Sequence, residues 1–201
     1  FVIASEHTVM AASDLSREFG INLSSTQFTA MRNWLSHEQD MMRLRTMAFH
    51  AVYGREFDVA LPEGQTYESW VGLMKHAVTQ LSTDMVNRTR KAGIRGGFAG
   101  GEAANFLKSL PANVFQADPN FVQSPYIQRI GTLFGIYQIF EVPTAICDQF
   151  VLDGVALGKE DILFYGRGDS IGDAGLIAGD AVPAIPYVHE TNPSLVNRTT
   201  L

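Results

Sequence analysis

Cysteine is nearly absent from this sequence, which has a single one, Cys147, among 201 residues. One cysteine cannot build an intrachain disulfide framework or a cysteine-based zinc site, and this usage suits a reducing compartment. Asp148 follows it, but the sequence identifies no histidine partner that would make the thiol a catalytic nucleophile. We therefore expect Cys147 to be a small buried hydrophobic residue.

Long apolar runs and clustered positive charge are also missing. No stretch approaches the roughly 18 to 20 apolar residues that span a bilayer, and no signal-peptide pattern is visible, so we expect a soluble protein without a membrane partner. Lys and Arg number 15 against 21 Asp and Glu, which gives a net charge of −6. Because binding to phosphates needs clustered cations, we expect no sequence-specific nucleic-acid binding.

Motifs that perform catalysis or hold a metal are missing as well. The five histidines show no H-E-x-x-H or paired spacing, and no G-x-S-x-G elbow occurs. The acidic residues near Gly166 lack the ligand spacing of a calcium-binding loop, so we expect them to be solvated turn carboxylates. The sequence therefore predicts no catalytic residues, no cofactor and no metal, and leaves open only an enzyme whose site is assembled from scattered residues.

A glycine-rich stretch, GIRGGFAGGEAANFLKSLP at residues 93–111, raises the alternative of a phosphate site at a strand-to-helix junction. Its spacing matches neither G-x-G-x-x-G nor a P-loop, and no lysine follows the last glycine. The segment GRGDSIGDAG, residues 166–175, places Ile171 where the third glycine of a dinucleotide motif belongs. We expect a tight structural corner, in which glycines permit positive φ and close backbone approach.

Two long helices precede this corner. The Ser-x-x-Gln spacing of Ser24 and Gln27 predicts a capping box, and the apolar periodicity predicts one helix of about 25 to 29 residues that ends before Gly54. Its buried stripe would contain Met31, Leu35 and Met42. A second helix is predicted over residues 66–91.

Short strands are predicted after residue 94, one of them within residues 145–153, with a single helix at residues 102–110. Long helices followed by hairpins indicate the α+β class, with mainly antiparallel sheets.

Taken in order, these segments resemble the major capsid proteins of tailed bacteriophages, especially the large-myovirus branch. Residues 13–52 resemble the passage in which an Asp-Leu pair, a turn with glycine and a long helix with a Leu-Ser-x-Glu core follow an extended loop. The matching positions here are Asp14-Leu15, Gly20 and Leu35-Ser36-His37-Glu38.

Three later segments resemble the same family. Residues 102–110 are similar to its short helix after a strand of the axial domain, and residues 126–143 to its hairpin with two glycines before a Val-Pro strand. Residues 161–188 resemble its late signature, in which a strand, a Gly/Asp turn and a Pro-Tyr-Val strand follow one another.

The resemblance implies the Johnson-type capsid fold, which encapsulins share. It places a peripheral-domain part with the spine helix at residues 1–52, the axial domain at residues 53–188, and a return toward the peripheral domain at residues 189–201. The N-terminal arm and extended loop of the family are expected to lie outside this chain.

The resemblance also implies a structural role without enzymatic activity. We expect self-assembly into hexamers and pentamers of an icosahedral or prolate phage head around double-stranded DNA, assembled in the host bacterial cytoplasm as part of a virion. The expected partners are many copies of the chain and scaffold, vertex, decoration or portal proteins. An encapsulin-like nanocompartment shell is the alternative. A subunit-contact loop is expected at Gly166, Arg167, Gly168, Asp169 and Asp173.

Overall fold

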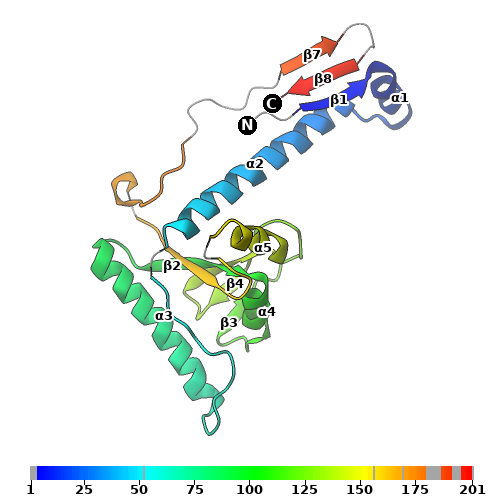
Figure 1. Cartoon of the computed structure of the whole chain (residues 1–201). Coiled ribbons are helices and arrows are strands. Elements are labelled where there is room, and N and C mark those ends of the chain that lie inside the picture. Colours follow the sequence, from blue (N-terminus) through cyan, green and yellow to red (C-terminus); the bar gives the residue numbers. More distant parts are fainter. Residues whose placement is uncertain are drawn as a thin grey trace. The chain divides into compact units, whose positions relative to one another are not determined.

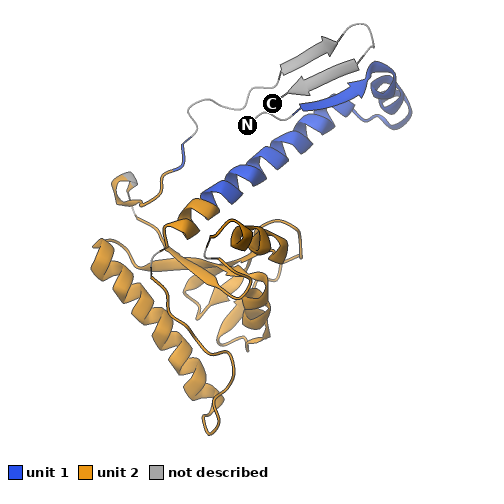
Figure 2. Ribbon diagram, viewed as in Figure 1, with its two compact units in different colours: residues 1–44, 178–201 blue, residues 45–177 orange. Residues whose placement is uncertain are grey.

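The chain divides into two compact units. The computed structural model describes residues 4–51, 53–155, 157–168, 170–179, 187–191 and 196–200. Unit 1 contains residues 1–44 and 178–201, and unit 2 contains residues 45–177 (Figure 2). Unit 2 is therefore built from one continuous stretch of chain, whereas unit 1 combines two distant stretches.

Unit 1 joins distant parts of the chain in one sheet. Strands β1 (Ala4–Thr8), β8 (Val196–Thr200) and β7 (Tyr187–Thr191) form an antiparallel sheet in that order (Figure 1). Helix α1 (Val9–Phe19) follows β1. It begins where the Thr8 hydroxyl accepts a hydrogen bond from the Ala11 N–H and ends at Gly20, whose φ of 66° is left-handed.

Helix α2 (Leu23–Phe49) is 27 residues long, which confirms the predicted length. The predicted capping box is wrong, because the helix begins earlier and the Asn22 side chain accepts a hydrogen bond from the Ser25 N–H at 3.1 Å. Ser24 and Gln27 instead hydrogen-bond to the ring of the buried His7, at 3.3 and 2.9 Å. These two side chains join β1 to the first turn of α2.

The buried side of α2 changes along its length. Met31 and Leu35 are buried as predicted, but Met42 is 59% exposed, and Leu44 and Ala48 are buried instead. At about 100° per residue, Met42 lies within roughly 20° of Met31, whereas Leu44 and Ala48 lie on a side rotated by roughly 220° to 260°. One amphipathic stripe therefore could not predict the burial of the whole helix.

Unit 2 is built on a five-stranded sheet with the order β3-β4-β5-β2-β6. The β2–β5 pair is parallel and the other three pairs are antiparallel, which confirms the α+β class with mainly antiparallel strands. The elements of this unit are α3 (Tyr67–Thr89), β2 (Ile94–Gly100), α4 (Gly101–Ser109), β3 (Phe115–Ala117), β4 (Gln128–Leu133), β5 (Tyr137–Val142), α5 (Thr144–Leu152), β6 (Ile162–Gly166) and the 3-10 turn η1 (Ile171–Asp173).

The core of unit 2 lies among the sheet, α3 and α4. Trp70 and Met74 of α3, Leu107 of α4 and Ile139 of β5 belong to one cluster of buried side chains. The second predicted long helix and the predicted short helix are thereby confirmed as α3 and α4, with ends within one or two residues of those expected. Together they position the glycine-rich strand β2.

Helix α5 replaces the strand predicted within residues 145–153, so that prediction is wrong. Ile146, Cys147 and Phe150 are buried on one side of this helix, which Pro143 precedes. Short apolar runs suit a buried helix as well as a buried strand, so the pattern alone does not separate them. Cys147 is fully buried as predicted, and its burial raises the pKa of the thiol.

Candidate functional site

The glycine-rich corner is the junction between β2 and α4, and its glycines leave room for backbone and side-chain atoms. A Cβ on Gly96 would lie 2.4 Å from the Gln138 carbonyl oxygen, and one on Gly100 would lie 2.4 Å from that of Gly158. A Cβ on Gly101 would lie 2.2 Å from Thr144 Oγ1. The predicted close approach is confirmed.

The expectation of positive φ at this corner is wrong. The glycines with positive φ in the described part of the chain lie at other positions, and Gly100 has φ −63° and ψ 163°. Strand β2 therefore continues into α4 through ordinary backbone dihedrals. The glycines are needed here for space, because neighbouring atoms occupy the positions that side chains would take.

The N–H groups that would hold a phosphate at this corner already have partners. Glu102 and Ala103, in the first turn of α4, donate to the Lys159 carbonyl oxygen at 2.9 and 3.1 Å. Gly100 donates to the carbonyl oxygen of Asp161 at 2.9 Å. The turn at residues 158–161 thus supplies the hydrogen-bond acceptors for the N–H groups at the start of α4. In a phosphate-binding site, the bound anion supplies these acceptors.

We predict that this corner binds no nucleotide. A phosphate would have to displace the Lys159 carbonyl oxygen as the hydrogen-bond acceptor, without the positive charge of a P-loop lysine. Replacing one acceptor by the other would therefore contribute little binding energy. Isothermal titration of ATP, GTP and NAD, each with and without Mg²⁺, is expected to give no heat beyond dilution. A micromolar dissociation constant for any of the three would contradict the structural role of the corner.

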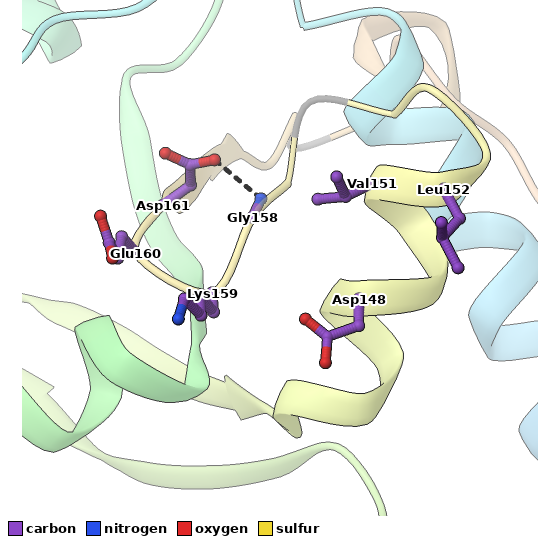
Figure 3. A pocket seen from close by; sticks show the side chains of 7 residues that line it. All are labelled: Asp148, Val151, Leu152, Gly158, Lys159, Glu160 and Asp161. Carbon is purple, nitrogen blue, oxygen red and sulfur yellow. Dashed lines mark hydrogen bonds between the residues drawn. The ribbon is translucent and has the colours of Figure 1, made fainter.

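A pocket of about 550 Å³ lies beside the same turn, between α5 and residues 158–161 (Figure 3). Asp148, Val151 and Leu152 line it from α5. On the other side, the Asp161 carboxylate accepts a hydrogen bond from the Gly158 N–H at 2.7 Å and holds the turn closed. Among the described residues, no group of three or more His, Cys, Asp or Glu side chains is placed to bind a metal ion.

A larger groove, of about 1240 Å³, is lined by residues 50, 51, 53–57 and 59 together with parts of α3, α4 and β6 and single residues of β2 and β4. Two cations on its wall have partners: the Arg88 guanidinium lies 4.4 Å from the centre of the Tyr53 ring, and Arg55 forms an ion pair with Asp84 at 3.3 Å. The sequence did not predict this groove, because its lining comes from segments that lie far apart in the chain.

The predicted subunit-contact loop begins at the end of β6. Gly166 is the last residue of the strand, and Arg167 is exposed without an ion pair to another described residue. A Cβ on Gly168 would lie 2.4 Å from the Cβ of Asp173, so the loop folds closely on itself. Asp169 lies outside the described residues.

Asp173 is not the solvated turn carboxylate that the sequence predicts. It forms an ion pair with Lys91, which follows α3, and accepts a hydrogen bond from the Ser170 hydroxyl at 2.9 Å. These partners lower the pKa of the Asp173 carboxyl below its ordinary value. The ion pair ties the loop to a segment 82 residues away, which no local pattern indicates.

Large apolar side chains are exposed on the first two helices. Met10 and Phe19 project from α1, and Trp34 and Phe49 from α2, where their exposed fractions are 59% and 70%. At about 100° per residue, Trp34 and Phe49 lie roughly 60° apart around the helix axis. Exposed aromatic residues on one side of a helix are candidate contact points for another molecule.

The described helices include none with both the length and the apolar character needed to cross a bilayer. No protein-family model matches the chain, and no curated protein sequence matches it.

Proposed function

We propose that this chain is a structural shell protein, the major capsid protein of a tailed bacteriophage, which self-assembles into hexamers and pentamers around double-stranded DNA. The observation that carries the proposal is the long helix α2, which exposes Trp34 and Phe49 to solvent. A second molecule would remove both side chains from water.

The energy available from these side chains is considerable. A buried aromatic side chain removes about 150 to 250 Å² from water, at about 25 cal/mol per Å². Since Trp34 and Phe49 are already partly covered, each would contribute about 2 to 4 kcal/mol when covered by a neighbouring molecule. In a shell the same contact recurs in every copy, so modest energies per contact stabilise a large particle.

The length of α2 also favours this function. Globular helices average about 11 to 12 residues, whereas α2 has 27 and belongs to both units. The family resemblance implies a spine helix at this place in the sequence. The proposal accordingly includes scaffold, vertex, decoration or portal proteins as partners, a place in the virion, and no enzymatic activity.

Assembly is the property that tests the proposal. Negative-stain microscopy and sedimentation of the full-length protein, alone and with a co-expressed scaffold, are expected to show closed particles, hexamers or pentamers. Trp34→Ala is expected to lower the particle yield because it removes an exposed contact residue. Asn33→Ala, an exposed neighbour on the same helix, is the matched control and should leave the yield unchanged.

Each outcome of this experiment separates the candidate functions. Particles large enough for a phage genome favour the virion, whereas smaller shells that contain a co-purified protein favour the encapsulin-like alternative. A stable monomer under all conditions, including with a scaffold, would contradict both shell functions and favour an enzyme with an unrecognised site.

A further inference from the structure

Strand β6 forms an open edge of the unit 2 sheet. Its only strand neighbour among the described residues is β2, and its backbone hydrogen bonds there all go to that strand. The opposite edge therefore presents N–H and C=O groups that can pair with another strand. Native proteins usually protect such an edge with charges, proline or a covering element.

The residues of this edge are unusually favourable for pairing. Ile162, Leu163, Phe164 and Tyr165 are apolar or aromatic and only half-buried, and no charge or proline interrupts them. Oppositely charged residues, Asp161 and Arg167, flank the strand. The strand is thus apolar in its centre and has one negative and one positive end.

We propose that two copies of the chain pair through this edge of β6 as antiparallel strands related by a two-fold axis. Such an axis runs perpendicular to the combined sheet. Each side chain therefore stays on the same face of the sheet in both copies, and the pairing is symmetric about one residue that lies opposite the same residue of the second copy. Centring on Phe164 sets Asp161 opposite Arg167 of the second copy, and Leu163 opposite its Tyr165. Symmetry repeats both pairs, which makes the edge complementary to itself.

The charges of Asp161 and Arg167 favour this antiparallel register over other ways of pairing the two strands. A parallel, in-register pairing would set Asp161 beside Asp161 and Arg167 beside Arg167 of the second copy, and like charges at opposite positions are unfavourable. A shift of two residues in the antiparallel register would also separate Asp161 from Arg167. Arg167 is exposed, and the ion pairs of the described residues do not include it, so the proposed register assigns it Asp161 of the second copy as its partner.

The face of the sheet that carries these pairs is already ordered by aromatic contacts. The Tyr165 ring lies 5.3 Å from that of Phe98 on β2, which in turn lies 5.6 Å from that of Phe140 on β5. These contacts hold Tyr165 in place, so little side-chain freedom remains to be lost when Leu163 of the second copy packs against it. The row of apolar contacts would then continue across the two-fold axis through Leu163 of the second copy.

This contact goes beyond the proposed shell function. A two-fold contact alone closes on itself and yields a dimer, whereas a shell needs further contacts. Two outcomes therefore separate the two proposals. A dimer without particles would contradict only the capsid function, and particles assembled from chains that never dimerise through β6 would contradict only the present inference.

Charge reversal tests the contact directly. In sedimentation equilibrium of the full-length chain at concentrations below assembly, Arg167→Asp is expected to raise the dimer dissociation constant about ten-fold, because it sets like charges together at two positions. Asp161→Arg is expected to weaken the dimer too. The double variant restores both opposite-charge pairs and should return the dissociation constant to within about three-fold of the wild-type value.

Two controls keep the test specific. Arg17→Asp makes the same change in net charge on α1 and should leave the dissociation constant unchanged. Asp161→Arg also removes the acceptor of the Gly158 N–H, so circular dichroism must show that this variant and the double variant fold. Three results would each overturn the proposal. Arg17→Asp could weaken the dimer as much as Arg167→Asp does, or the double variant could fold without recovering the wild-type dissociation constant. The third is a wild-type chain that stays monomeric at every concentration.

Discussion

Gly100→Ala is expected to destabilise unit 2 by about 3 kcal/mol, because the new methyl group collides with fixed backbone atoms. Its Cβ would lie 2.4 Å from the Gly158 carbonyl oxygen and 2.6 Å from that of Lys159. The Lys159 oxygen also accepts the hydrogen bonds of the first turn of α4. Relieving the collision would stretch those bonds. Urea unfolding followed by far-ultraviolet circular dichroism measures the loss.

Gly72→Ala is the matched control. Gly72 lies inside α3, and a Cβ there would meet nothing within 4 Å. Alanine has a higher helix propensity than glycine. The free energy of unfolding of this variant is therefore expected to rise by about 0.5 to 1 kcal/mol. The same substitution should thus have opposite signs at the two sites. A loss of similar size in both variants would contradict the space-filling role of the β2–α4 corner.

Trp70→Ala is expected to lower the free energy of unfolding by about 3 to 5 kcal/mol, the range for removing a large aromatic side chain from a core. Trp70 is 4% exposed, and its ring centre lies 5.4 Å from that of Phe57 and 5.9 Å from that of Phe106. Its Nε1–H donates to the Asp58 carbonyl oxygen at 3.1 Å. The substitution removes contacts among α3, α4 and residues 57–58 together.

Trp34→Ala provides the comparison, since the chain contains only these two tryptophans. Because Trp34 is exposed, its replacement should lower the free energy of unfolding of the unassembled chain by less than about 0.5 kcal/mol. Each variant leaves one tryptophan, so fluorescence during urea unfolding follows the buried residue in one and the exposed residue in the other. Similar losses in both variants would show that Trp70 does not occupy the core.

The sequence predicted the elements that depend on local patterns. Apolar periodicity predicted α2, and the helices predicted over residues 66–91 and 102–110 are α3 and α4. Closely spaced glycines indicated a junction where neighbouring backbone approaches, as Gly96 and Gly100 confirm. These signals lie within a few residues of the structure that they determine, so one sequence is sufficient to interpret them.

The features that the sequence did not predict depend on contacts between distant residues. Gln27 hydrogen-bonds to His7 instead of closing a capping box. Met42 lies on the predicted stripe but is exposed, because the part of α2 around it is buried on another side. Asp173 of the predicted contact loop pairs with Lys91, and the open edge of β6 follows from the strand order of the whole sheet.

The pairing of β1 with β8 sets an order for folding during synthesis. Ala4 lies opposite Thr200, so this sheet requires residues that leave the ribosome almost 200 positions apart. Unit 2, which is continuous from residue 45 to residue 177, can form its core while translation proceeds. Strand β1 must wait for its partner. We therefore expect a newly made chain to present a folded unit 2 before its three-stranded sheet exists, which would delay any contact that needs this sheet until residue 200 has been translated.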